Sequence, residues 1–427
     1  MSQLRHNLKH SAIDGTAYSV MVGLAENQFP AFVLAIGATQ VTSGLVATVP
    51  ICLCAILQLL TPWGVRKLGS YRLWTAGNAY LQAAALVPLI VCAWLGRVPT
   101  WLVFAAGTVY WFGSVSGGPA WTTWKCLIFP ERLRARYFAR RSRWCNAGVL
   151  LGLLLGGLFI ERVQAASPDD SRAVLRAFAV VFTLACVARV VSGTEMLRIS
   201  EPRPLDMNER DVSWREFGSK ALHSFDGRFI LFAGATAIAA QIAQPFFNPY
   251  VLKQVGLESA RHLHAALLAA AFAGRMAVLP LAGRIAHRHG ALRLAWMSAI
   301  ALVPLAPLWT LSDHIGVLFA VQVLVGGMWG AFELASLLMF FDALHPRERT
   351  SILTKWNLVN YACMAGGSLI GGRLLAALGE DRRAYLIVFA ASALARLLAL
   401  ALLMRARQPA GVVEEPTLTQ PDAALPP

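Results

Sequence analysis

Residues 263–311 read LHAALLAAAFAGRMAVLPLAGRIAHRHGALRLAWMSAIALVPLAPLWTL, and this stretch decides the fold class. Two apolar runs, near 263–283 and 293–311, flank a short loop that is rich in arginine. A helix crosses a bilayer with about 20 mostly apolar residues, so each run is long enough to do so. Because Lys and Arg are retained on the cytoplasmic side of membranes, we expect the loop between the two helices in the cytosol.

The composition extends this interpretation to the whole chain. Of 427 residues, 57% are hydrophobic and only 14% are charged, and the mean hydropathy is +0.55. A soluble protein carries about 25% charged residues. The net charge of +15 is spread over short clusters between apolar runs, not gathered in one basic domain. The chain is therefore predicted to be a polytopic membrane protein, and a disordered chain or a nucleic-acid binder is excluded.

Apolar runs recur along the chain and predict twelve membrane spans. They lie near residues 16–37, 44–64, 73–95, 100–123, 144–161, 174–197, 228–250, 263–283, 293–311, 315–342, 356–378 and 384–404. Basic residues, Lys125 among them, concentrate in every second loop. This pattern places both termini, 1–15 and a Pro-rich disordered tail 405–427, in the cytosol beneath the plasma membrane. A cytoplasmic linker, 198–227, separates two sets of six spans, and 212–222 is expected to form an amphipathic helix.

The cysteines and histidines indicate neither a disulfide framework nor a metal site. Six of the seven cysteines lie in apolar stretches, where they act as small apolar side chains. The two His-x-His pairs place their rings on nearly opposite helix faces. No Gly-rich loop is followed by Lys-Ser or Lys-Thr, so no phosphate-binding loop is indicated. We expect no metal, no cofactor and no cleavable signal segment.

The two sets of six spans look duplicated. Four segments of the first set match segments of the second in the same order: Pro30–Gly37 with Pro249–Gly256, Arg66–Arg72 with His287–Arg293, Gly156-Gly157 with Gly371-Gly372, and Ala188-Arg189 with Ala395-Arg396. Four matches in register predict a six-plus-six repeat, 16–197 and 228–404.

The loop from Gly283 to Arg293 resembles the signature loop of the major facilitator superfamily, Gly-x-x-x-Asp-Arg-x-Gly-x-x-Arg. The resemblance covers roughly residues 12 to 405. It implies an all-α transporter of two six-helix halves around one central site. It also implies gate loops that comprise Arg66, Gly69, Arg72, Gly283, His287, Arg288, Gly290 and Arg293. The family's acidic latch residue is replaced by Arg66 in one copy and by His287 in the other.

Charged residues within spans cost several kcal/mol in a membrane and are therefore candidates for function. Glu26 stands beside Asn27 and Gln28, three polar residues that either line a cavity or join helices by hydrogen bonds. Glu333 follows Trp329 by one helical turn, which suits an aromatic-walled pocket or simple packing.

Three arginines complete the set of charged residues within spans. Arg275 is expected either to pair with one of the two glutamates or to bind an anionic substrate. Arg189 and Arg396, which are related by the repeat, are expected to snorkel or to pack between helices.

In the resembled family, spans one, four, seven and ten line the central cavity. The matching residues here are Tyr110 and Trp111 in span four, and Gln241, Gln244 and Asn248 in span seven. The spacing of the last three predicts one polar stripe that faces either the cavity or a neighbouring helix. Weaker candidates are Asn146, Asn357, Asn360 and Tyr361.

These features predict a secondary transporter of a small organic solute that works as a monomer in the lipid bilayer. No ATP-binding signature is present, so a gradient must drive accumulation, most simply of protons carried by Glu26 or Glu333. Uniport stays open. The aromatic and amide-rich cavity favours an uncharged or amphipathic solute. The alternatives are a polytopic membrane enzyme, which the scattered histidines disfavour, and a transporter-like sensor or scaffold.

Overall fold

The computed structural model describes residues 2–167, 170–201, 210–255, 261–310, 312–345, 347–379 and 381–404. Every regular element in these ranges is helical. The tail expected to be disordered, 405–427, lies outside the described residues.

The N-terminal half contains the first six spans. The first consists of α1 (Ser2–Ala25), the 3-10 turn η1 (Glu26–Gln28) and α2 (Phe29–Ala35). The second consists of α3 (Gln40–Leu57), η2 (Gln58–Leu60) and α4 (Thr61–Leu68). The remaining four are α5 (Tyr71–Leu95), α6 (Thr100–Ile128), α7 (Glu131–Ala166) and α8 (Ser171–Arg198).

The linker and the C-terminal half follow the same plan. The linker forms α9 (Trp214–His223), close to the amphipathic helix expected at 212–222. The seventh span comprises α10 (Phe225–Ala243), η3 (Gln244–Phe246), α11 (Phe247–Pro249) and the π-turn η4 (Tyr250–Gln254). The last five are α12 (Arg261–His289), α13 (Ala291–Leu308), α14 (Ile315–Ala343), α15 (Arg349–Ala377) and α16 (Arg382–Met404).

The twelve-span fold is confirmed, although hydropathy alone finds fewer spans. Within the described ranges, nine helices are long and apolar enough to cross a membrane. The other three spans contain α1, α6 and α15. These helices carry buried polar residues such as Asp14, Thr123 and Thr354. Side chains that face the protein interior lower the mean hydropathy of a span without exposing a polar group to lipid.

The first helix begins before the span predicted at 16–37. The segment 1–15, expected to be cytoplasmic, is helical from Ser2 as part of α1. Asn7, Ser11 and Asp14 are buried, and α1 packs against α7 and α8. Asn7 donates a hydrogen bond from Nδ2 to the Ser200 hydroxyl at 2.6 Å. The polar residues of this segment therefore have partners inside the protein.

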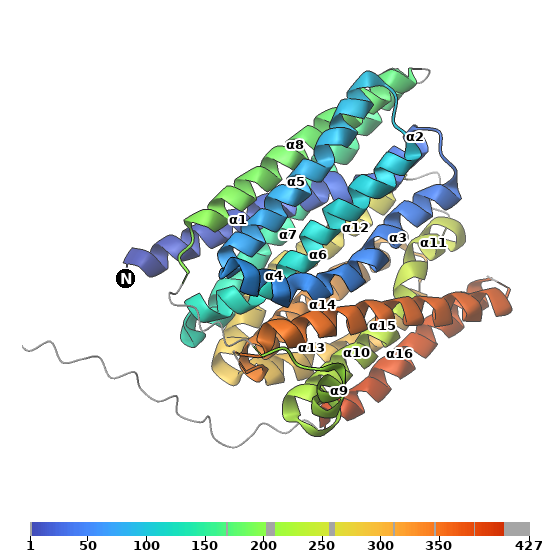
Figure 1. Cartoon of the computed structure of the whole chain (residues 1–427). Helices are drawn as coiled ribbons and strands as arrows, with labels where there is room; N and C mark the ends of the chain where they lie inside the picture. The colour runs from blue at the N-terminus through green and yellow to red at the C-terminus, as the bar shows by residue number, and fades with distance from the viewer. Residues whose placement is uncertain are drawn as a thin grey trace, which may run out of the picture.

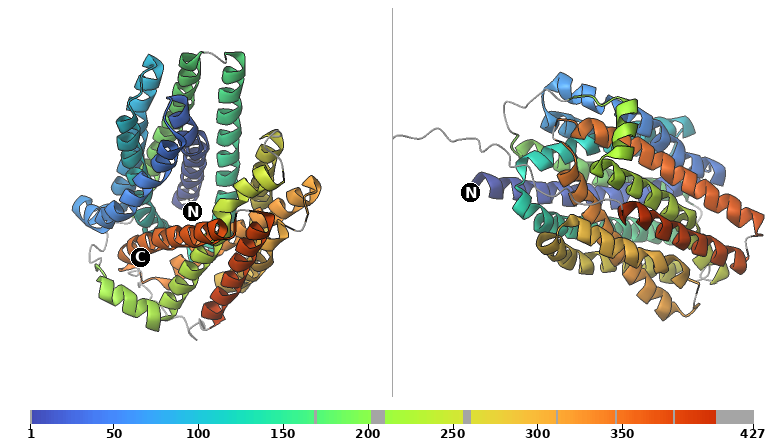
Figure 2. Two further views of the ribbon diagram at one scale, coloured as in Figure 1. Left: turned by 90° about the vertical axis from the view of Figure 1, so that its right-hand side faces the viewer. Right: turned by 90° about the horizontal axis from the view of Figure 1, so that it is seen from below.

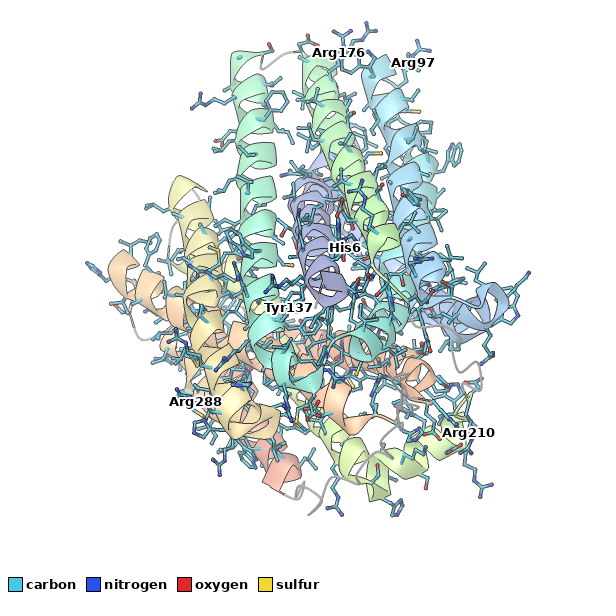
Figure 3. All side chains as sticks on the ribbon, turned by 90° about the vertical axis from the view of Figure 1, so that its left-hand side faces the viewer. His6, Arg97, Tyr137, Arg176, Arg210 and Arg288 are labelled. Carbon is cyan, nitrogen blue, oxygen red and sulfur yellow. The ribbon has the colours of Figure 1, made fainter. Side chains whose placement is uncertain are left out.

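The two ends of the bundle differ in their basic residues and in how closely the two halves approach each other. Figure 3 shows Arg210 and Arg288 at one end and Arg97 and Arg176 at the other. We call the first the basic end, because the Arg- and Lys-rich segments 125–143, 284–293 and 347–355 lie there. The sequence predicted loops at these segments, but most of each is helical, in α6, α7, α12, α13 and α15. The N-terminal half (blue to green) and the C-terminal half (yellow to red) form two bundles (Figures 1 and 2).

The halves meet near the basic end. There α12 packs against α7, and α15 packs against α6 and α4. The hydroxyl groups of Thr123 and Thr350 are 2.9 Å apart across the interface. Gly283 allows a close approach, because a Cβ at this position would lie 2.5 Å from the Ala139 Cβ.

Candidate functional site

The first span is broken where its polar residues lie. Ala25 ends α1, and the turn η1 leads into α2, whose second residue is Pro30. Proline cannot donate a helical hydrogen bond, which favours a change of helix type just before it. The seventh span breaks at the equivalent place, at η3, which contains Pro245. Both halves therefore interrupt their first helix inside the membrane.

Glu26 occupies the break in the N-terminal half. The Tyr110 hydroxyl donates a hydrogen bond to Glu26 Oε1 at 3.1 Å. Within the described part of the chain, no cationic side chain lies within 4.0 Å of this carboxylate. Tyr361 of α15, a weaker candidate, lies within electrostatic range of Glu26 from the other half. Gln28 is buried and faces Gly156 of α7, and the side chain of Asn27 lies outside the described residues.

Beneath Glu26, a polar network joins four helices of the N-terminal half. Arg189 donates to Gln82 Oε1 at 2.7 Å and to the Ser192 hydroxyl at 2.8 Å. Ser192 in turn donates to Asp14 Oδ1 at 2.8 Å. Arg141 lies 3.5 Å from the other Asp14 oxygen. Arg189 is only 4% exposed, so it packs between helices and does not snorkel.

Lys125 is a further buried cation that the sequence analysis placed in a cytosolic loop. Its ammonium group lies 3.8 Å from the centre of the Trp124 ring. Among the described residues, no hydrogen-bond acceptor contacts it. Its position at the edge of a basic loop disguised its burial. The neighbouring Trp121 and Trp124 were the signal that could have revealed it, because cations stack on aromatic faces.

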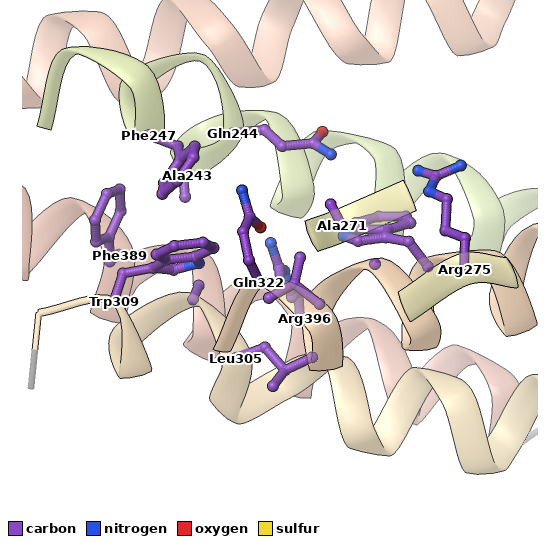
Figure 4. Close-up of a pocket in the computed structure, with 14 residues that line it drawn as sticks. Ala243, Gln244, Phe247, Ala271, Arg275, Leu305, Trp309, Gln322, Phe389 and Arg396 are labelled. Atoms are coloured by element: carbon purple, nitrogen blue, oxygen red, sulfur yellow. The ribbon is translucent and has the colours of Figure 1, made fainter. Parts of the chain in front are cut away.

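The C-terminal half contains a pocket of about 190 Å³ between α10, η3, α12, α13, α14 and α16. Figure 4 shows Gln322 and Arg396 in its middle, with Phe247, Trp309 and Phe389 grouped on one side and Arg275 on the other. Gln244 and Trp329 also line it. The pocket therefore unites three residues expected from the sequence, Gln244, Arg275 and Trp329.

Arg396 is the buried cation of this pocket. It is 7% exposed. One Nη donates to the Leu302 carbonyl oxygen at 2.7 Å, and Nε has no hydrogen-bond partner in the described ranges. No ion pair to Arg396 is found there either. Its guanidinium carbon lies 5.8 Å from the centre of the Trp329 ring. Like Arg189, Arg396 packs between helices and does not snorkel. Unlike Arg189, it has no acidic partner among the described residues.

Arg275 pairs with Glu333. The distance between Arg275 Nη1 and Glu333 Oε2 is 2.7 Å, and the two side chains are 26% and 53% exposed. Of the two glutamates that the sequence offered as its partner, Arg275 thus contacts Glu333. This leaves Glu26 and Glu333 in different settings, one beside a tyrosine and the other beside a cation.

The polar stripe expected in the seventh span divides between two neighbours. Gln241 accepts a hydrogen bond from the Ser368 hydroxyl of α15 at 3.4 Å. Gln244, in the turn η3, lines the C-terminal pocket, and Asn248 is exposed. The change of helix type at η3 ends the regular three-and-four spacing on which the prediction rested.

The remaining aromatic and amide candidates have smaller roles. Trp111 contacts Tyr110 edge to face, with ring centres 5.7 Å apart. Asn357 donates to Gln58 Oε1 at 3.2 Å across the two halves. Asn146 donates to the Ser142 carbonyl of its own helix, and Asn360 contacts Met364.

The two gate loops are used differently. In the first, Gly69 ends α4 at φ +59°, and Glu201 accepts hydrogen bonds from the Ser70 hydroxyl and the Arg72 amide at 2.5 and 3.0 Å. In the second, Gly290 precedes α13 at φ +86°. The side chains of His287, Arg288 and Arg293 are exposed.

The linker supplies an acid near the first gate loop. Asp211 accepts hydrogen bonds from the Ser351 hydroxyl at 2.6 Å and from Lys355 Nζ at 2.9 Å. Partial burial raises the pKa of Asp211, but the hydrogen bonds from Ser351 and Lys355 outweigh it and hold the pKa below its ordinary value. Arg66, at the position of the missing latch acid, adds to this attraction.

Comparison with known proteins gives the family and the fold. The family model "Major Facilitator Superfamily" matches residues 15–362. FucP in an outward conformation, described elsewhere as the fucose:proton symporter of E. coli, covers 94% of this chain and 98% of its own at 12% identity and TM-score 0.74. A bacterial homologue of the iron transporter ferroportin in an outward-facing state has a TM-score of 0.69 and 11% sequence identity, and the match covers 95% of this chain and 99% of the homologue. The human organic anion transporter MFSD10 has a TM-score of 0.67 and 13% sequence identity, and the match covers 94% of this chain and 99% of MFSD10. No curated sequence matched significantly.

Proposed function

Because this chain belongs to the major facilitator superfamily, we propose that it moves a small organic solute across the plasma membrane by alternating access, driven by protons. The two halves touch near the basic end, where Thr123 meets Thr350 and Gly283 lies against Ala139. Rocking about such an interface exposes a site to each side in turn.

The basic end is assigned to the cytosol. Arg- and Lys-rich segments at the helix ends lie there, and such segments are retained on the cytoplasmic side of membranes. The first residues of α1 also lie at this end, since His6 contacts the Arg198 carbonyl oxygen. In this orientation the structure is closed to the cytosol, and the N-terminus is cytoplasmic.

Glu26 is the proposed proton carrier, and its setting is the observation that carries the coupling proposal. Burial disfavours the charged form of a carboxyl group, whereas a nearby hydrogen-bond donor or cation favours it, so a group subject to both can gain and lose a proton. Glu26 is half-buried, accepts a hydrogen bond from Tyr110 and lies within electrostatic range of Arg189. Glu333 is less suited, because it is already paired with Arg275 at 2.7 Å and its side chain is 53% exposed.

The test compares two glutamates, Glu26 and Glu161, in proteoliposomes. Solutes from a library are first screened for saturable flux and for movement of protons with the solute. Glu26→Gln, which mimics the protonated acid, should abolish gradient-driven accumulation of any hit but retain solute exchange. Glu161→Gln, a matched change at an exposed residue of α7, should behave like the parent. If Glu26→Gln accumulates solute like the parent, Glu26 is not the coupling acid.

The same assay separates this proposal from the two other classes. A membrane enzyme would convert the solute chemically, and a sensor or scaffold would bind it without flux. Parent protein that binds a solute saturably but moves none of it would contradict the transport proposal.

A further inference from the structure

The two repeat-related arginines leave different amounts of charge unbalanced. Arg189 lies in a network that contains the carboxylate of Asp14, whereas Arg396 has only a backbone carbonyl as a hydrogen-bond partner among the described residues. Arginine stays protonated in proteins, so Arg396 cannot relieve its burial by losing a proton. A buried charge without a counter-charge destabilises a protein by several kcal/mol. Its retention calls for an anion from outside the chain.

The space beside Arg396 has the size and lining of a ligand site. The amide of Gln322 is buried beside it, and we find no hydrogen bond to this amide within the described ranges. Phe247 and Trp309 lie against each other in the wall, with ring centres 3.9 Å apart. A cavity of about 150 Å³ accommodates benzene. The 190 Å³ here therefore has room for one aromatic ring and a small polar group.

The charges in the pocket favour one negative charge on the ligand. Arg275 is already balanced by Glu333 at 2.7 Å, so Arg396 is the unbalanced cation. A planar guanidinium matches a carboxylate, which accepts two parallel hydrogen bonds. Aromatic walls contribute apolar area and edge-to-face contacts with a ring.

We propose that this pocket within the C-terminal half binds a small aromatic monocarboxylate, with Arg396 and Gln322 holding the carboxylate and Phe247, Trp309 and Trp329 enclosing the ring. This deepens the proposed function, on which it rests for the idea that the bound solute is also transported. It replaces the uncharged or amphipathic solute expected from composition by an amphipathic anion. The solute site then lies beside the central axis, within one half.

Calorimetric titration of the purified full-length protein with benzoate at pH 7 tests the proposal. We expect saturable binding, and binding of the uncharged analogue benzamide at least about tenfold weaker, because it leaves Arg396 without a counter-charge. Arg396→Gln should weaken benzoate binding at least about tenfold, while a thermal melt shows it to be folded. Arg373→Gln, which removes an exposed arginine of α15, should bind like the parent.

Two outcomes would overturn the proposal: no saturable benzoate binding by the parent, or equal affinities for the parent and Arg396→Gln. Arg396→Lys adds a second test, because it keeps the charge but loses the planar fork. It should bind benzoate more weakly than the parent and more tightly than Arg396→Gln. Binding does not require transport, so benzoate that binds without flux contradicts the transport function alone. Flux of another solute without benzoate binding contradicts only this inference.

Discussion

Arg189 and Arg396 lie at matching places in the two halves, yet their surroundings have opposite character. Around Arg189, side chains from α5 and α8 accept hydrogen bonds from the guanidinium group, and Asp14 of α1 supplies the counter-charge through Ser192. Around Arg396 there is a pocket, and one carbonyl oxygen accepts its hydrogen bond. The two repeat-related arginines thus have different surroundings: Arg189 lies in a filled hydrogen-bond network, and Arg396 lies beside a pocket with room for a ligand.

The difference indicates a division of labour between the halves. A satisfied buried network fixes the relative positions of the helices that contribute to it. In the proposed transport cycle, we expect the N-terminal half to move as a rigid body that carries Glu26. Among the described residues of the C-terminal half, Arg396 keeps a nitrogen without a hydrogen-bond partner, which the proposed solute would satisfy. Breaking the first arrangement should therefore cost stability, whereas altering the second should change binding.

The largest effect is expected at Asp14, the counter-charge of the N-terminal network. Asp14→Asn keeps the volume but leaves Arg189 and Arg141 without an anion, at a cost of about 3–5 kcal/mol in the free energy of unfolding. Denaturant titration of the purified protein measures this cost, with Glu161→Gln as the exposed control. An Asp14→Asn midpoint equal to that of the parent would contradict the network's role.

A smaller effect is expected at Gly283, where the halves meet. Gly283→Ala places a Cβ 2.5 Å from that of Ala139, and overpacking of this kind costs about 1–3 kcal/mol. The strain exists only while the basic end is closed, so the population should shift toward opening there. Distances between spin labels on exposed residues of α7 and α12 report the shift.

Gly366→Ala is the matched control for this prediction, because a Cβ at Gly366 meets no atom within 4 Å. Its distance distribution should equal that of the parent. A Gly283→Ala distribution that also equals that of the parent would show that the contact does not limit opening.

The smallest effect is a pH dependence at Asp211, which joins the linker to the C-terminal half. Because its pKa is held below the ordinary value, its contribution is present above about pH 4 and is lost as the pH falls through the folded pKa. Its side chain is 59% exposed, so solvent screening limits the contribution to less than about 1 kcal/mol.

Hydrogen exchange at the Val212 amide, which donates to the Ser351 hydroxyl at 3.0 Å, measures this effect. At pH 6, Asp211→Asn should exchange faster than the parent, by a few-fold. Once the pH has fallen below the folded pKa of Asp211, both proteins carry an uncharged side chain, so their rates should converge. A difference that stays constant over the whole acid titration would assign the effect to shape, not to charge.

Much of the fold could be predicted from sequence, because apolar length and charge asymmetry act locally along the chain. The start of α1 and the burial of Lys125 could not. The start of α1 depends on partners far away in sequence, such as Ser200 for Asn7. Lys125 stacks on the adjacent Trp124, but its burial depends on how α6 packs in the bundle. A polar residue near a terminus has the same sequence signal whether it meets water or a buried partner.

The candidate site was only partly visible for the same reason. Intramembrane charges are rare, so Glu26, Arg275, Glu333 and Arg396 stood out by residue type alone. Whether each charge has a partner could not be predicted, because Ala188-Arg189 and Ala395-Arg396 have the same local sequence pattern. Gln82 and Asp14 come from other helices and decide that only the first arginine is satisfied.

The most direct test of this contrast is the melting temperature of Arg189→Gln and Arg396→Gln without added ligand, each compared with the parent in the same detergent. Arg189→Gln breaks a buried network and should melt clearly lower, by the equivalent of several kcal/mol. Arg396→Gln removes a buried charge that has no counter-charge, and it should melt at the parent's temperature or above. Equal losses in the two variants would contradict the division between a closed half and a ligand-binding half.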